Sequence, residues 1–207
     1  MPFVITISRQ LGSGGSYVGQ QISQRLNIFY ADREIIREAA NQLSLLEEEL
    51  ESRDEKISSF WKSFFQSFAF VEPDVYIPQK NFAPTDLELF KTESGIIKRI
   101  AEERSSVIIG RCGSFILRDH PNHISIFLHS DKNFRKERIK NIYNISEKAA
   151  EKMIERCDKE RALYYRKFTG KDWMDMTQYN ITIDTAKIGL DNCIELIMYY
   201  IQLIGKC

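Results

Sequence analysis

Residues 5–22, ITISRQLGSGGSYVGQQI, join an apolar run, a glycine-rich turn and a segment with helical spacing. The run from Phe3 to Ser8 is short and β-branched, which is typical of a buried parallel strand. Apolar residues then recur at four-residue steps, so 16–26 is predicted to be a helix. A glycine turn between a strand and a helix gathers free backbone N–H groups at the positive end of the helix, and this arrangement binds phosphate.

The turn matches only part of the P-loop pattern GxxxxGK[ST], whose lysine contacts the terminal phosphates and whose hydroxyl contacts magnesium. The segment RQLGSGGS at 9–16 keeps the second glycine as Gly14 and the hydroxyl as Ser16. Arg9 replaces the first glycine, and Gly15 replaces the lysine. The position between strand and helix favours phosphate binding. The alternative is a tight turn whose glycines only permit close packing.

The rest of the chain alternates further predicted strands with helices. The strands are expected at 28–33, 105–110, 123–130 and 179–185, and the main helices at 85–103, 131–143, 146–168 and 190–204. This alternation predicts an α/β fold with a doubly wound, five-stranded parallel sheet in a three-layer α/β/α arrangement. The 207 residues are sufficient for one such domain.

Residues 41–84 differ from their surroundings and are expected to form a helical insertion. Ser44 and Glu47 have the spacing of a capping box, and aromatic residues recur at helical spacing from Phe60 to Phe68. This aromatic stripe is expected to pack under a lid or to form the contact of a homodimer. Its acidic flanks argue against binding to a membrane surface.

Composition excludes several classes of function. The formal net charge is zero, so nothing overall argues for nucleic acid or a membrane as partner. There is no signal-peptide pattern and no apolar run of about eighteen residues, so a cytoplasmic protein is expected. The four cysteines and three histidines have neither metal-ligand nor disulfide-framework spacing.

Charged residues after several strands are candidates for phosphate chemistry. Arg111 follows a predicted strand, at the sheet edge where ligands of α/β folds bind. Arg135 and Arg138 share a predicted helix face, as do Asp158 and Arg161. Arginines there can neutralise a transferring phosphoryl group, although each alone could equally be an exposed residue with a carboxylate partner.

Asp32 follows the second predicted strand and has two interpretations. Its carboxylate could orient an acceptor at the sheet edge, or it could cap the helix that begins beside Arg33 and Glu34. Considered alone, the helix cap is the stronger interpretation.

Taken together, these segments resemble the cytidylate kinase-like proteins, a branch of the P-loop nucleoside monophosphate kinases. The resemblance runs from Phe3 to Ile204, except for about 41–84, where these kinases carry an acceptor-binding insertion. It is carried by the segments ITISRQLGSGGSYVGQQISQRL, FYADREII, IIGRCGSFIL, ISIFLHSDKNFRKERI and YNITIDTAKIGLDNCIELI.

The resemblance implies a role for each matching residue. Asp32 and Arg111 would bind the acceptor, and residues from about 131 to 172 would form a lid with Arg135, Arg138, Asp158 and Arg161 as catalytic groups. Asp184 would lie near the donor base. The phosphate loop would consist of Arg9, Gly12, Ser13, Gly14, Gly15 and Ser16, with Ser16 also close to the metal.

The resemblance implies ATP-dependent phosphoryl transfer, with Mg2+ as cofactor, to a small phosphorylated acceptor, most simply a nucleoside monophosphate such as CMP. Gly15 in place of the lysine and Cys112 in place of an aspartate depart from the family pattern. Arg9, Arg111 or a lid arginine could supply the missing cation. The alternatives are a non-catalytic nucleotide- or phosphate-binding protein and a P-loop transferase with another donor or acceptor.

Overall fold

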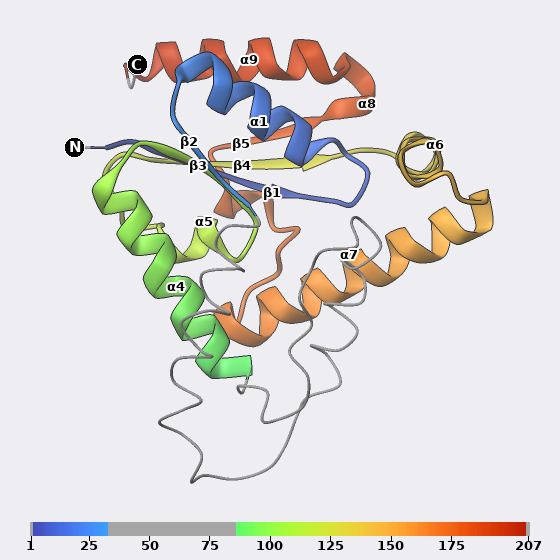
Figure 1. Ribbon diagram of the computed structural model, residues 1–207, viewed down its shortest axis with the longest axis horizontal. Helices are drawn as coiled ribbons and strands as arrows, with labels where there is room; N and C mark the ends of the chain where they lie inside the picture. The colour runs from blue at the N-terminus through green and yellow to red at the C-terminus, as the bar shows by residue number, and fades with distance from the viewer. Residues whose placement is uncertain (1, 33–85, 206–207) are drawn as a thin grey trace, which may run out of the picture.

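A five-stranded parallel sheet lies between two layers of helices (Figure 1). The computed structural model describes residues 2–32 and 86–205. The strand order is β2-β3-β1-β4-β5, which confirms the predicted three-layer α/β/α fold with a parallel sheet. The strands are β1 (Val4–Arg9), β2 (Phe29–Ala31), β3 (Ser106–Ile109), β4 (His123–His129) and β5 (Ile181–Asp184).

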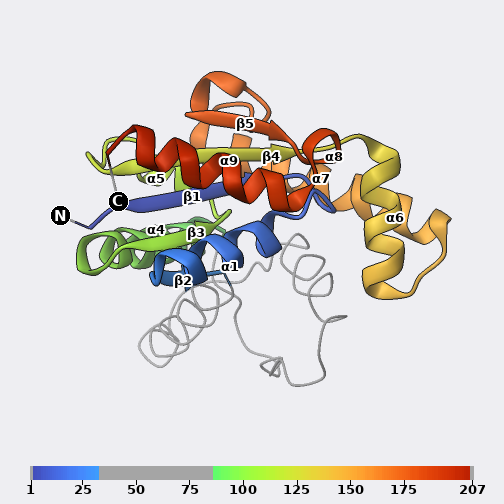
Figure 2. The same ribbon diagram turned by 90° about the horizontal axis from the view of Figure 1, so that it is seen from above.

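The helices pack on both faces of the sheet. In Figures 1 and 2, α1 (Gly15–Leu26) and α9 (Leu190–Leu203) lie side by side on one face. On the other face lie α4 (Asp86–Glu103), the short α5 (Gly113–Ile116) and α7 (Glu147–Thr169). The helix α6 (Lys132–Tyr143) lies beyond the carboxyl ends of the strands. The short α8 (Thr185–Ile188) and a 3-10 turn (Met176–Gln178) complete the described elements.

The alternation of side chains along β1 divides the core between the two faces. Ile5 and Ile7 are fully buried against α1 and α9, whereas Val4 packs with α4 on the other face. Because successive strand residues point to opposite faces, a strand covered on both sides is apolar throughout. Burying an aliphatic side chain of this kind contributes about 1.5–3 kcal/mol.

Helix boundaries follow local capping chemistry. The Asp131 side chain accepts a hydrogen bond from Phe134 N at the start of α6, and Ser146 caps α7 in the same way through Ala149 N. Asn144 and Gly170 end these helices in the left-handed conformation. Each N-cap contributes about 1 kcal/mol to helix stability.

Several sequence expectations are refined by the structure. The last strand is shorter than predicted, and the short helices α5 and α8 were not expected. Apolar periodicity cannot reveal helices of a single turn. The expected insertion at 41–84, with its aromatic stripe from Phe60 to Phe68, lies outside the described residues, so it stays a prediction, as does the homodimer.

Two helical glycines offer a test of how tightly α1 packs on the sheet. A Cβ atom at Gly19 would lie 2.5 Å from Ile109 Cδ1 in the core, whereas one at Gly95 in α4 would meet nothing within 4 Å. We expect Gly95→Ala to raise the free energy of unfolding by about 1 kcal/mol, because alanine is the better helix former. Gly19→Ala should lower it, since overpacking costs about 1–3 kcal/mol. Urea unfolding measures the free energy of unfolding of both variants. An equal increase in both would contradict the tight contact between α1 and the sheet.

Candidate functional site

The glycine-rich loop at 10–14 joins the end of β1 to the start of α1, and its backbone is shaped by glycine. Gly12 and Gly14 have φ of 85° and 87°, in the left-handed region that favours glycine. A Cβ atom on Gly12 would lie 2.8 Å from the Arg135 carbonyl oxygen of α6. Gly14 caps α1 without any side-chain hydrogen bond, so the first amides of this helix remain available to an anion.

The loop is anchored from inside by two hydroxyl groups. Ser13 is buried, and its hydroxyl donates to the carbonyl oxygens of Gln10 (2.9 Å) and Leu128 (3.1 Å). Thr185, at the end of β5, donates to the Ser13 carbonyl oxygen at 2.9 Å. Ser13 therefore contributes to the loop by fixing its shape, and its side chain points away from a ligand bound at the amides.

Asp158 of α7 anchors the loop from outside. Its Oδ1 accepts a hydrogen bond from Leu11 N at 2.9 Å, and its Oδ2 accepts one from Arg135 Nη1 at 2.5 Å. Arg135 is buried and also donates to the carbonyl oxygens of Ser130 and Leu11. These contacts favour a positioning role for Arg135 and Asp158, and their predicted catalytic role stays a prediction.

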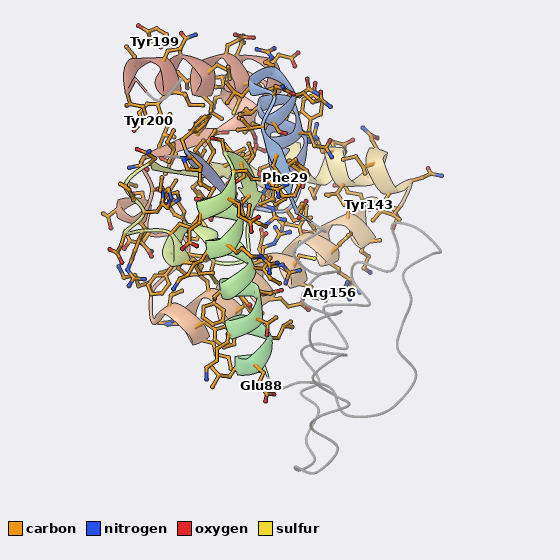
Figure 3. All side chains as sticks on the ribbon, turned by 60° about the vertical axis from the view of Figure 1, so that its left-hand side comes forward. Phe29, Glu88, Tyr143, Arg156, Tyr199 and Tyr200 are labelled. Carbon is orange, nitrogen blue, oxygen red and sulfur yellow. The ribbon has the colours of Figure 1, made fainter. Side chains whose placement is uncertain are left out.

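The other two predicted lid arginines reach the loop backbone as well. Arg138 donates through Nε to the Gly12 carbonyl oxygen at 3.1 Å, and burial lowers its pKa. Arg161 donates through Nη1 to the Arg9 carbonyl oxygen at 3.1 Å and lies 3.7 Å from Asp158. Side chains of α6 and α7 therefore bond to the backbone at Gly12 and Arg9, and the lid role of these helices stays a prediction. Figure 3 shows Tyr143 and Arg156, on α6 and α7, on the side of the molecule away from Tyr199 on α9.

Arg9 lies at the centre of the site. Its side chain passes over Gly15, where a Cβ atom would come within 2.6 Å of Arg9 Cγ, and its guanidinium group lies against Gly110 at the end of β3. Arg9 Nη2 is 3.8 Å from Asp32 Oδ1. Burial, followed by the charge of Arg161, lowers the pKa of Arg9, and the Asp32 carboxylate partly offsets both, so that the pKa is about 10. Arg9 is therefore still a cation at neutral pH.

Asp32 follows β2 and also contacts the start of α1. The Ser16 hydroxyl donates to Asp32 Oδ2 at 3.3 Å, and the Tyr30 hydroxyl donates to the same oxygen at 3.2 Å. Burial, followed by the charge of Asp32, raises the pKa of Tyr30, so this hydroxyl keeps its proton. The segment that follows Asp32 lies outside the described residues, so the helix-cap interpretation stays a prediction.

Arg111 is presented by an unusual turn after β3. Gly110, Arg111 and Cys112 all have positive φ (71°, 53° and 55°), and such a conformation costs about 1–3 kcal/mol for a residue with a side chain. Arg111 Nη1 forms an ion pair with Glu93 Oε1 of α4 at 3.1 Å, and Glu93 is 1% exposed. The Tyr164 hydroxyl of α7 donates to Glu93 Oε2 at 2.8 Å.

These groups converge on a cavity at the carboxyl edge of the sheet. It brings together three of the predicted arginines and Asp32, with walls from β1, β3 and α7. Burial, followed by the charge of Glu93, raises the pKa of the Cys112 thiol in its wall, which therefore stays protonated. Its lining residues are Ser8, Arg9, Asp32, Gly110, Arg111, Cys112, Glu160, Arg161, Tyr164, Tyr165 and Trp173.

A second, more open pocket lies beside the start of α1. Arg138, which bonds to the loop at Gly12, belongs to its lining, and the Arg138 guanidinium lies 5.9 Å from the Phe134 ring. The predicted donor-base residue Asp184 is absent from this lining, and its carboxylate caps α8 through Ala186 N. The pocket is lined by Tyr17, Phe134, Arg138, Gly189, Leu190 and Asp191.

Sequence reasoning missed Tyr164 in the first cavity, Glu93, which pairs with Arg111 and Tyr164 of that cavity, and Tyr17 in the second. Glu93 was one of several acidic residues on a predicted helix, and its burial depends on the packing of α4 beneath the sheet. Ser16 could be selected because it occupies the hydroxyl position of the P-loop pattern. Nothing in the local sequence separates Glu93 from its exposed neighbours.

Comparison with known proteins identifies the class. The chain belongs to the cytidylate kinase-like family, whose model matches residues 4–187. A cytidylate kinase of Saccharolobus islandicus is 25% identical over 111 residues, which cover 54% of this chain and 58% of the relative. The match therefore spans little more than half the length of this curated relative.

Solved structures show the same fold. A structure of an uncharacterized protein from Eubacterium ventriosum has a TM-score of 0.69 at 26% identity, covering 97% of this chain and 98% of that one. The architecture is shared by shikimate kinase from Bacteroides thetaiotaomicron, with a TM-score of 0.53 at 12% identity over 97% of this chain and 98% of that one. It is also shared by a gluconokinase from Sinorhizobium meliloti, with a TM-score of 0.52 at 14% identity over 96% of this chain and 97% of that one. The predicted P-loop kinase fold is confirmed. None of the described helices has the length and apolar character needed to cross a membrane.

The Asp158 contacts generate a stability test. Asp158→Ala would leave the buried Arg135 charge without its carboxylate and Leu11 N without an acceptor, so we expect a loss of about 3–5 kcal/mol in the free energy of unfolding. Glu155→Ala on the same helix removes an exposed partner of Lys132 (2.7 Å) and should cost less than about 1 kcal/mol. Equal losses in urea unfolding would contradict the anchoring role of Asp158.

Proposed function

We propose that the protein transfers the γ-phosphoryl group of ATP to a small phosphorylated acceptor, most simply a nucleoside monophosphate such as CMP. The observation that carries the proposal is the convergence of Arg9, Arg111 and Arg161 on one cavity beside the phosphate loop. Three guanidinium groups in a partly buried site fit two phosphoryl groups brought together for transfer.

The loop separates two places for the two substrates. The donor phosphates would lie over the amides at 12–16, with the donor base in the open pocket beside Tyr17 and Arg138. The acceptor phosphate would enter the cavity near Asp32 and Arg111. The transferring group would then lie between them, beneath Arg161.

The transfer itself needs positioning and charge neutralisation. An oxygen of the acceptor phosphate forms a bond to the γ-phosphorus as the bond to the bridging oxygen breaks, and that electron pair leaves with ADP. An ionised acceptor phosphate carries no proton on the attacking oxygen, so no general base is required. The arginines stabilise the charge on the transferring group in a partly buried site.

Two oxygen atoms beside the loop also fit the coordination of magnesium. Ser16 Oγ and Asp32 Oδ2 lie 3.3 Å apart, close to the separation of about 3 Å between neighbouring oxygens around octahedral Mg2+. These two residues would hold the ion together with phosphate oxygens and water. Magnesium is usually bound in this way, without a full set of protein ligands. Bound Mg2+ would neutralise charge on the β- and γ-phosphates.

A second function is supported by one specific feature. Gly15 lacks the lysine that normally contacts the terminal phosphates, so the protein could bind a nucleotide without transferring phosphate. The acceptor, the homodimer and the cytoplasmic location all stay predictions.

An assay with ATP, Mg2+ and a panel of nucleoside monophosphates tests the proposal, and we expect ADP release with CMP among the best acceptors. Arg161→Ala should lower turnover by about 100-fold or more, because it removes a cation from the transferring group. Lys159→Ala, an exposed residue on the same helix, should leave turnover unchanged. ATP binding without ADP release for any acceptor would favour the binding protein instead.

A further inference from the structure

The two departures from the P-loop pattern lie against each other in space. Arg9 stands where the pattern has its first glycine, and Gly15 stands where it has its lysine. A Cβ atom on Gly15 would lie 2.6 Å from Arg9 Cγ and 2.7 Å from Arg9 Cβ. The two positions therefore compete for one volume, which a side chain from either position, but not from both, can fill.

The Arg9 side chain follows a path that only glycines permit. After crossing Gly15, it ends against Gly110, where a Cβ atom would collide with Arg9 Nη1. Gly110 also has a φ of 71°, so the turn after β3 both needs glycine and leaves space for the guanidinium group. The Arg9 side chain is 14% exposed, so its charge is directed into the site and away from bulk water.

Among the described residues, Arg9 forms an ion pair with Asp32, a carboxylate that it shares with the loop. Asp32 Oδ1 lies 3.8 Å from Arg9 Nη2, longer than a hydrogen bond, while Asp32 Oδ2 accepts the Ser16 hydroxyl. Arg161 and Arg111 add positive charge nearby. Within the described part of the chain, the guanidinium group is therefore only partly neutralised, and the Asp32 carboxylate connects it to the hydroxyl that would bind the metal.

We infer that Arg9 and Gly15 are one coupled exchange, in which a guanidinium group from the end of β1 takes the place of the P-loop lysine on the terminal phosphates of the donor. This inference rests on the proposed function and names its missing cation. Arg9 is then a catalytic residue that contacts the γ-phosphoryl group during transfer. Its planar fork can bind two phosphate oxygens in a fixed bidentate geometry, whereas a lysine acts as a point charge.

The test moves the cation back to the position that the pattern gives it. Arg9→Gln keeps a stem over Gly15 and removes the charge, Gly15→Lys adds a second side chain to the occupied volume, and Arg9→Gly with Gly15→Lys relocates the cation. Arg9→Gly alone is the matched control for the double variant. Thermal unfolding of each variant establishes that it is folded.

Calorimetric titration with ATP and with AMP, each without an acceptor, reports phosphate binding independently of turnover. For Arg9→Gln we expect ATP affinity to fall about 10- to 100-fold, the loss typical of one charge-assisted hydrogen bond, and AMP affinity to stay within about twofold. The double variant should recover at least about tenfold in ATP affinity over Arg9→Gly. Gly15→Lys alone should bind ATP more weakly than the double variant.

The outcomes separate this inference from the proposed function. If Arg9→Gln binds ATP as tightly as the unsubstituted protein, or if the double variant gains nothing over Arg9→Gly, the coupled exchange is wrong even where ADP release continues. If the unsubstituted protein releases no ADP but its preference for ATP over AMP depends on Arg9 as expected, the exchange holds and phosphoryl transfer is wrong.

Discussion

The Asp158 carboxylate is the interaction on which the rest of the site depends. One carboxylate oxygen accepts a hydrogen bond from the Leu11 amide of the glycine-rich loop, and the other accepts one from the buried Arg135 side chain. The loop comes from the start of the chain, and Asp158 comes from α7, far along the sequence. This one group therefore fixes α7 to the loop, and it lies beside Arg161, which donates to the Arg9 carbonyl oxygen.

The site is built from arginines whose charges are balanced by separate carboxylates. Asp158 neutralises Arg135, Glu93 neutralises Arg111, and Asp32 lies at longer range from Arg9. Charges held apart in this way are already oriented, which is the arrangement that the proposed phosphate binding requires. The partly buried Tyr164–Glu93 hydrogen bond extends the same network to α4 and connects α7 with the Arg111 side of the cavity.

Much of this architecture could be predicted from the sequence, because it depends on local patterns. The five strands follow from short apolar runs. The side chains of Asp131 and Ser146 cap their helices by accepting hydrogen bonds from amides only three residues further along the chain. The convergence of Arg9, Arg111 and Arg161 was predicted only in outline. Parallel strands bring their carboxyl ends to one edge, but neighbours at that edge depend on strand order. Glu93 could not have been selected, since its burial is a property of packing.

The strand–loop–helix unit, the glycines that shape it and the missing P-loop lysine can all be read from the order of the residues. These features depend on residue type and short spacing, which a sequence shows directly. The position of Arg9 over Gly15 and the inward direction of Ser13 became visible only in the folded chain. Folding alone placed the charges of Arg135 and Arg111 beside carboxylates from distant helices. The physical reason is that a side chain's partners are set by close packing between elements, and packing in turn depends on the whole fold.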